Sequence, residues 1–126
     1  MKSRREQRAV IIEMLYTIDL LDQWEMPETF ETDFIGDMVS GILANREKID
    51  ALIVSQLERW SLKRLSYVDR AILRLATYEL YDTETPHEIV INEALVQTRA
   101  FTDEGDNKAV YFNNSVLDKI RKSLNK

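Results

Sequence analysis

The sequence predicts an all-α fold, a compact bundle of helices, and three observations predict it. Apolar residues recur at steps of three and four along most of the 126-residue chain, which is the helical period. No strand-like alternation of useful length appears. Only three glycines and two prolines are available for turns, which favours helices. The length suits a single domain that buries a real core.

The first helix is expected to follow the basic start of the chain and to end near Asp22. Its broad apolar face is formed by Ile11, Ile12, Leu15, Ile18 and Leu21. Residues 23–32 are acidic and include Pro27, so they are interpreted as a connection. Three large side chains are expected to anchor this connection to the core: Trp24, Met26 and Phe30.

Thr32 or Asp33 is expected to cap a second helix, which breaks at Asn45. Its apolar stripe consists of Phe34, Ile35, Met38, Val39, Ile42 and Leu43. Gly41 weakens this helix by about 1 kcal/mol relative to Ala, and the usual reason is the close approach of a neighbouring helix. A third amphipathic stretch follows at residues 49–60, on Ile49, Leu52, Ile53, Gln56, Leu57 and Trp60.

After a connector at residues 61–65, the central helix is expected from Ser66 to Leu80. Ser66 and Asp69 have the spacing of a capping box. The apolar stripe is wide and consists of Val68, Ala71, Ile72, Leu75, Ala76 and Leu80. Arg70 and Arg74 are four residues apart and therefore share a second face. Taken alone, these two arginines are interpreted as an ordinary solvated face.

Two helices complete the bundle. Thr85-Pro86-His87-Glu88 is a strong helix start, with Pro at the first helical position, and that helix ends near Phe101. Its apolar residues are expected to be mostly buried: Ile89, Val90, Ala94, Leu95 and Val96. Residues 102–107 form an acidic loop. The apolar positions of the last helix are Ala109, Phe112, Val116, Leu117 and Ile120.

The composition excludes several functional classes. The absence of cysteine rules out disulfides and thiol chemistry, and a single histidine, His87, rules out a His-rich metal site. No run is long and apolar enough to span a bilayer, and no apolar segment of signal-peptide type follows the basic start. These features fit a reducing, cytoplasmic setting and predict no membrane association.

Charge is segregated along the chain, whose net charge is −5. Acidic residues dominate from Glu13 to Asp50, where only Arg46 and Lys48 oppose them. The basic N-terminal tip is formed by Lys2, Arg4, Arg5 and Arg8. Together with Arg70 and Arg74, this tip is a local positive footprint for a phosphate backbone on one side of an acidic protein.

The sequence offers little chemistry for catalysis. There is no Gly-rich phosphate loop, and no Ser-His-Asp arrangement can be recognised. Acidic pairs such as Glu84/Glu88 and Asp103/Asp106 are interpreted as solvated carboxylates. Glu93 lies among apolar residues, which favours a structural role as the acceptor for a nearby arginine. No enzyme activity, cofactor or metal site is predicted.

Several stretches together resemble one family, the NusB transcription antitermination and termination factors. They occur in the family's order and cover most of the chain: Arg4-Arg5 and Arg8 with Leu15-Tyr16; Asp50 and the Trp60 region; residues 68–76 with Tyr78-Glu79-Leu80; Pro86; Ile91-Asn92-Glu93-Ala94; and Phe112 with Asn114 and Val116-Leu117-Asp118. The central helix and the Ile-Asn-Glu-Ala stretch are the specific parts.

The resemblance implies a helical fold of two small packed subdomains, here about 1–60 and 61–126. It implies binding of the single-stranded boxA element of ribosomal RNA leaders together with the ribosomal protein NusE, in the RNA polymerase antitermination complex. The residues that inherit RNA contact are Lys2, Arg4, Arg5, Arg8, Arg70 and Arg74. Base contacts are expected from three aromatic residues as well: Tyr16, Tyr111 and Phe112. Asp69, which opens the central helix, is expected to contact NusE.

The sequence departs from the family pattern near the last helix. The family's Phe-Val-Asn-Gly is Phe112-Asn113-Asn114-Ser115 here, and Tyr111 replaces a usual lysine. One positive charge is lost, while the tyrosine offers a ring for base stacking. The alternative hypothesis is a protein-docking or assembly module that uses its acidic flank and binds no RNA. RNA binding requires the arginines of the tip and of the central helix to form one surface.

Overall fold

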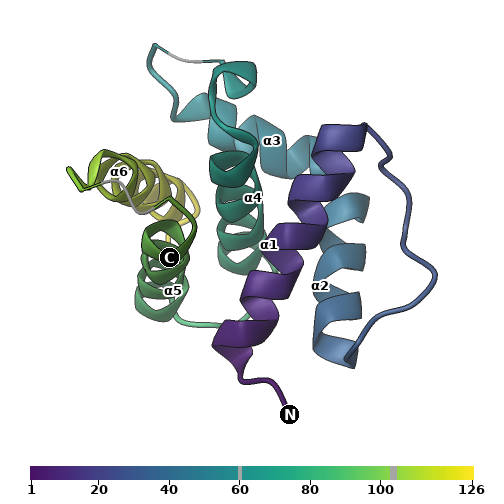
Figure 1. The fold of residues 1–126 in the computed structure, drawn as a ribbon. Coiled ribbons are helices and arrows are strands. Elements are labelled where there is room, and N and C mark those ends of the chain that lie inside the picture. The colour runs from purple at the N-terminus through teal and green to yellow at the C-terminus, as the bar shows by residue number, and fades with distance from the viewer. Residues whose placement is uncertain (60, 103–104) are drawn as a thin grey trace.

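The computed structural model describes residues 1–59, 61–102 and 105–126, and the described chain is helical without a strand. The elements in order are α1 (Arg4–Leu21), α2 (Asp33–Ala44), α3 (Arg46–Ser55), the 3-10 turn η1 (Leu62–Arg64), α4 (Tyr67–Asp82), α5 (His87–Thr102) and α6 (Lys108–Ser123) (Figure 1). The predicted all-α fold is confirmed.

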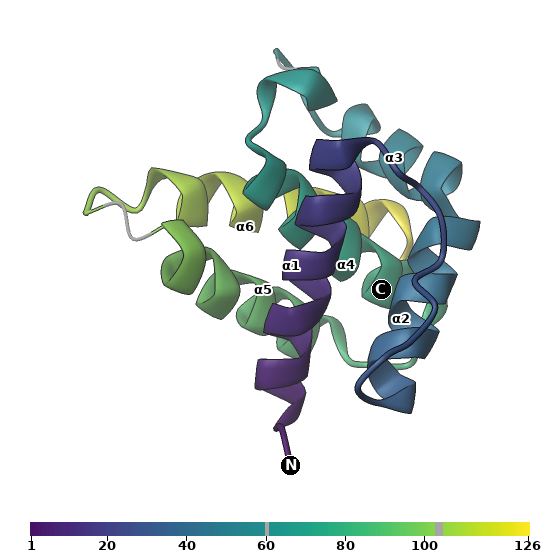
Figure 2. The same cartoon turned by 45° about the vertical axis from the view of Figure 1, so that its right-hand side comes forward.

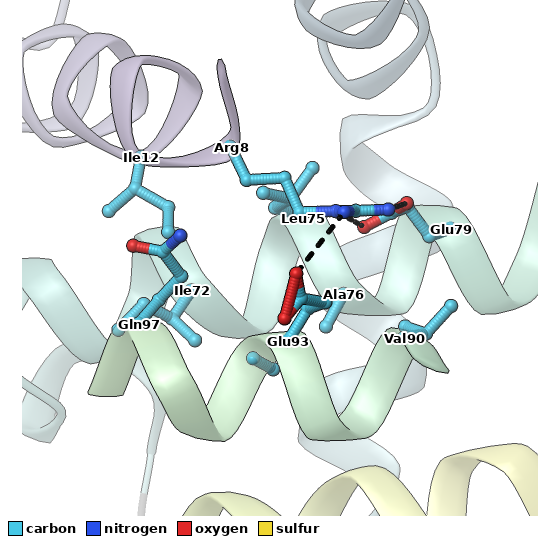
Figure 3. Close-up of a pocket in the computed structure, with 10 residues that line it drawn as sticks. Arg8, Ile12, Ile72, Leu75, Ala76, Glu79, Val90, Glu93 and Gln97 are labelled. Atoms are coloured by element: carbon cyan, nitrogen blue, oxygen red, sulfur yellow. Dashed lines mark hydrogen bonds and ion pairs between the residues drawn. The ribbon is translucent and has the colours of Figure 1, made fainter. Parts of the chain in front are cut away.

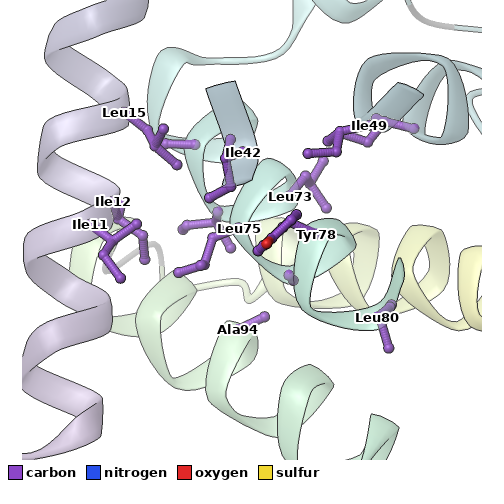
Figure 4. Close-up of a cluster of buried hydrophobic side chains, with 14 of the residues drawn as sticks. Ile11, Ile12, Leu15, Ile42, Ile49, Leu73, Leu75, Tyr78, Leu80 and Ala94 are labelled. Atoms are coloured by element: carbon purple, nitrogen blue, oxygen red, sulfur yellow. The ribbon is translucent and has the colours of Figure 1, made fainter. Parts of the chain in front are cut away.

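Helix α4 is the centre of the molecule. It packs against each of the other five α-helices, and Figure 1 shows α1 to α3 on one side of it and α5 and α6 on the other. Its residues from Arg70 to Leu80 are all buried. Figure 4 shows how side chains of α1, α2 and α3 converge on this helix around Leu73 and Leu75. The predicted central position of this helix is therefore confirmed.

Helix α1 begins earlier than its apolar pattern suggested. The Ser3 hydroxyl accepts a hydrogen bond from the Glu6 amide, and the Glu6 carboxylate accepts one from the Ser3 amide. This capping box satisfies two of the free amides at the helix start. As a result, the basic tip is held in a rigid first turn of helix.

The connection between α1 and α2, residues 22–32, lies along the side of the molecule away from α5 and α6 (Figures 1 and 2). We call it the strap. Trp24 anchors it, because the Arg46 guanidinium lies 3.5 Å from the Trp24 ring centroid and the indole donates to Asp22 at 2.9 Å. At its other end the Thr32 hydroxyl donates to Gln7 at 2.6 Å. Of the three predicted anchors, Trp24 is half-buried, Met26 is 43% exposed, and Phe30 is 38% exposed with its ring against Gly36 of α2.

Three sequence-based details require correction. Helix α3 ends at Ser55 rather than reaching residue 60, because the amides of Gln56 and Leu57 bond to carbonyls three residues back and tighten the chain into a turn. Ile89 was expected to be buried on α5 but is 49% exposed. Pro86 precedes α5 by one residue and supplies the carbonyl that accepts from Ile89 and Val90. Trp60 and the Asp103 of the proposed acidic pair lie outside the described residues.

Candidate nucleic-acid interface

The basic tip is formed by the first turn of α1 and the residues just before it. Lys2, Arg4 and Arg5 are exposed. The Lys2 ammonium lies 3.4 Å from Glu31, and Arg5 forms a bidentate pair with Glu93 of α5 at 2.9–3.2 Å. Arg4 stacks on the Phe34 ring of α2, with 3.8 Å to the centroid. Stacking leaves the charge of Arg4 uncompensated, so this residue is the most available cation of the three.

Arg8, the fourth predicted member of the tip, is only 7% exposed. Its guanidinium donates to both carboxylate oxygens of Glu79 at 2.8 and 3.1 Å and lies 3.8 Å from Glu93 (Figure 3). Burial disfavours the charged guanidinium, but the hydrogen bonds and charges of these carboxylates outweigh it, so the pKa of Arg8 is raised. The cation is thus permanent and already neutralised.

Arg74 and Arg70 do not form the exposed positive face that the sequence suggested. Arg74 is 3% exposed, pairs with Asp50 of α3 at 2.8 and 3.2 Å, and donates to Asp19 of α1 at 2.8 Å. The Arg70 Nε lies 3.1 Å from the same Asp19. The expected exposure is wrong because carboxylates 55 and 24 residues away in the chain turn inward to meet Arg74. Their role in RNA binding stays a prediction.

An aromatic cluster lies at the other end of α1. Tyr16 and Tyr67 meet edge to face, with 6.0 Å between ring centroids, and the Arg70 guanidinium lies 4.1 Å from the Tyr67 centroid. Tyr67 is 37% exposed and was missed in the sequence, where it reads only as the first residue of a helix. We call Tyr16, Tyr67 and Arg70 the aromatic corner.

Arg5 and the aromatic corner lie along the same side of α1, whereas Arg4 faces Phe34 of α2 and Lys2 faces Glu31 of the strap. Tyr16 follows Arg5 by about three full helical turns, which places both side chains in line and about 16 Å apart along the axis. Arg5 contacts α5 and Tyr16 contacts α4, so both face the side of α1 opposite the strap. The structure therefore brings these predicted residues together on one surface.

The two predicted aromatic residues of α6 differ in exposure. Tyr111 is 70% exposed. Phe112 is half-buried and lines a surface cavity of about 220 Å³ with Leu57, Arg59 and Lys119. Such a ring can receive an unstacked base on its open face.

Asp69 is more than a helix cap. One carboxylate oxygen accepts from the Ser66 hydroxyl at 3.0 Å, and the other accepts from the Asn113 amide of α6 at 3.3 Å. Asn113 is fully buried and also donates to Thr98 of α5. Asp69 thus links α4 to α6 while its side chain stays partly exposed to solvent.

A search of residues 1–59, 61–102 and 105–126 finds no group of three or more His, Asp or Glu side chains placed to hold a metal ion. Within the same residues, every helix is too short or too polar to cross a membrane. Glu93 is structural in its contacts, as the sequence suggested, since it accepts hydrogen bonds from Arg5 and lies 3.8 Å from the Arg8 guanidinium.

The chain is similar over its whole length to known proteins. The NusB family model matches residues 4–122. The transcription antitermination proteins NusB of Bacillus cereus (strain B4264) and Bacillus anthracis (strain CDC 684) are each 37% identical, over 96% of this chain and 98% of theirs. Among solved structures, T. maritima NusB has a TM-score of 0.83 at 33% identity, covering 96% of this chain and 92% of that one.

The crystal structure of a plectonemic RNA supercoil contains a chain of the same fold, with a TM-score of 0.83 at 27% identity, covering 100% of this chain and 99% of that one. The family match extends across the tip, the aromatic corner and most of α6. The chain therefore belongs to the NusB family of transcription antitermination proteins, which is a family of transcription factors and not of enzymes.

Proposed function

We propose that this chain binds single-stranded, boxA-like RNA of ribosomal RNA leaders together with NusE, as part of the RNA polymerase antitermination complex in the cytoplasm. The observation that carries the proposal is the alignment of Arg5 with the aromatic corner along one side of α1, beside the exposed cations Lys2 and Arg4 at the start of the helix. Cations that hold phosphates and rings that stack on bases are the two components of a single-strand binding surface.

The rest of the charge distribution supports a one-sided RNA surface. Between Arg8 and Arg46 the sequence contains no Lys or Arg, and its acidic strap lies away from α5 and α6. A phosphate backbone is repelled there and attracted at the tip. The solved RNA supercoil that contains a chain of this fold adds support for RNA as the ligand class.

We assign different tasks to the predicted residues. Lys2, Arg4 and Arg5 contact phosphates, and the aromatic corner contacts bases. Tyr111 and Phe112 extend the base-contacting surface onto α6. Arg8 and Arg74, which are buried on carboxylates, act as positioning residues: Arg8 fixes α1 on α4, and Arg74 fixes α4 on α1 and α3.

The first test is a salt-dependent titration with a boxA-like strand and a scrambled strand, each with and without NusE. If the three exposed cations Lys2, Arg4 and Arg5 engage phosphates, the slope of log affinity against log salt is about −2, because each contact contributes about −0.7. Replacing Lys2, Arg4 and Arg5 with Ala weakens binding to both strands and flattens the slope. Discrimination between the strands survives better, because base contacts supply it.

Arg8 is left out of this triple variant because its loss unpairs the buried Glu79 and confuses unfolding with lost binding. The matched control replaces three exposed cations elsewhere, Lys48, Lys122 and Lys126, with Ala. An unchanged affinity and slope in the tip variant would reject RNA binding through the tip. That outcome would favour the alternative of a protein-docking module that binds no RNA.

Asp69 supplies a separate test of the NusE partnership. Asp69→Asn removes the charge but keeps one oxygen that can accept from Asn113. We expect weaker NusE binding in isothermal titration, with a fall in unfolding free energy of about 1 kcal/mol for the hydrogen bond lost. The control is Asn113→Ala, which removes the same link to α6 but leaves the charge. If both variants bind NusE as the parent does, Asp69 has only its structural role.

A further inference from the structure

A second surface lies on the opposite side of α1 from the aromatic corner, between this helix and the strap. It is a groove with a cavity of about 300 Å³, lined by Val10, Glu13, Met14, Thr17, Ile18 and Pro27. The proposed RNA surface makes no use of these side chains. We call this surface the strap groove.

The strap groove continues into exposed apolar side chains. Leu21 follows Ile18 by about one turn of α1 and is 56% exposed, and Met26 precedes Pro27 and is 43% exposed. Val10 and Met14 pack on the core with part of their surface only. A contiguous apolar patch with a polar rim marks an interaction surface on a folded protein.

The rim of the strap groove carries a single sign of charge. Glu13 lines the groove, and Glu25 and Glu28 flank Met26-Pro27 on the strap. All three are exposed, and none of them forms an ion pair with another described residue. By contrast, Asp19 is occupied by Arg70 and Arg74, and Glu31 by Lys2. Three uncompensated carboxylates therefore lie on or beside the groove.

We propose that the strap groove is a docking surface for a basic amphipathic segment of a protein partner. The apolar side chains of that segment enter between Met14 and Pro27, and its Lys or Arg side chains face Glu13, Glu25 and Glu28. Helix-in-groove recognition uses this combination of apolar anchors and complementary charge. The same carboxylates repel nucleic acid, so the groove serves a partner other than RNA.

The four methionines of the chain permit a direct test. With methionine methyl groups labelled for NMR, Met14 and Met26 report on the groove, Met38 reports on α2, and Met1 reports on the basic tip. The probe is a synthetic amphipathic helix of about 16 residues with Leu on one face and Lys on the other. We expect saturable shifts of Met14 and Met26 alone. A Ser/Lys peptide of equal charge, which lacks the apolar face, is expected to bind far more weakly.

Changing Glu13, Glu25 and Glu28 together to Gln is expected to lower the affinity for the Leu/Lys peptide about tenfold, because three exposed ion pairs with the peptide are lost. The matched control changes Glu47, Glu84 and Glu88 to Gln, with the same loss of charge elsewhere on the surface. The proposal is overturned if both triple variants weaken binding equally, if Met38 or Met1 shifts instead, or if the rim variant changes the oligomeric state in light scattering. The last result would make a second copy of this chain the occupant.

The same labelled protein keeps this inference separate from the proposed function. RNA binding at the tip is expected to shift the methyl signal of Met1 and to leave that of Met14 unchanged, whereas peptide binding is expected to do the reverse. Failure of either titration therefore leaves the other interpretable.

Discussion

A buried guanidinium that carboxylates hold on two sides is not free to bind a phosphate, and Arg8 is held in this way. It bridges Glu79 of α4 and Glu93 of α5 in a site almost closed to water. Arg4 lies one helical turn earlier and stacks on Phe34 with its charge uncompensated. These two arginines therefore have opposite uses, one in packing the helices and one in presenting charge.

Replacing Arg8 with Met is expected to lower the free energy of unfolding by about 3–5 kcal/mol, because Glu79 is left buried without its partner. Arg4→Met, which loses only an exposed ring contact, costs about 1 kcal/mol or less. Urea denaturation measures both. If Arg8→Met retains the parent's stability while RNA affinity falls as far as in Arg4→Met, then Arg8 contacts RNA directly.

The difference between Arg4, Arg5 and Arg8 could not be predicted from the sequence. Spacing shows that a helix carries them, but it does not show where α5 crosses α1, and that crossing decides which side is covered. Glu93 was more informative, because a carboxylate among apolar residues needs a cationic partner. The sequence therefore predicted an ion pair between Glu93 and an arginine, although it did not show which arginine. The burial of Arg74 could not be predicted for the same reason, because its partners Asp50 and Asp19 come from two other helices.

At the scale of elements, the contact between α2 and α4 depends on a residue with no side chain. A Cβ at Gly41 would overlap the ring and hydroxyl of Tyr78, which occupies that space. The predicted close approach of a neighbouring helix at Gly41 is thus confirmed. The helical period of the sequence places Gly41 within α2. It does not show that the neighbouring residue is Tyr78 of α4, which only the three-dimensional structure reveals.

Gly41→Ala is expected to destabilise the protein by about 1–3 kcal/mol, because overpacking against Tyr78 outweighs the better helix propensity of alanine. Gly105→Ala is the control, since a Cβ there meets no atom within 4 Å. Thermal melts followed by circular dichroism compare the two. A Gly41→Ala variant as stable as the parent would mean that Tyr78 moves aside without cost.

Helix boundaries were predicted well where capping chemistry or a break marks them, and poorly elsewhere. Asn45 separates α2 from α3, and Ser66 caps α4 through the Asp69 amide, as expected. The end of α3 at Ser55 has no Gly or Pro to announce it, and the amphipathic spacing continues past it. Apolar periodicity indicates which side chains face the core. Leu57 packs against the core although it lies in the turn after α3, so the apolar spacing continues past the end of the helix.

On the scale of the whole molecule, α4 connects both halves of the chain. The division into subdomains at about residue 60 stays a prediction, and α4 bears on it because this helix packs against α1, α2 and α3 as well as α5 and α6. The halves share one core cluster, in which Ile35 and Ile120 belong to opposite ends of the chain. A shared central helix favours a single cooperative unfolding transition.

Ile72→Ala is expected to lower the unfolding free energy by about 2–5 kcal/mol, since the side chain is 1% exposed and its removal leaves a cavity in that shared core. If the molecule unfolds as one unit, the unfolding free energy falls by the same amount whether it is measured in α2 or in α6. NMR signals from the methyl groups of Ile35 in α2 and Ile120 in α6, followed through a urea titration, are therefore expected to shift to the same lower midpoint. Separate midpoints, with α5 and α6 melting apart from α1 to α3, would establish two independently folding subdomains instead.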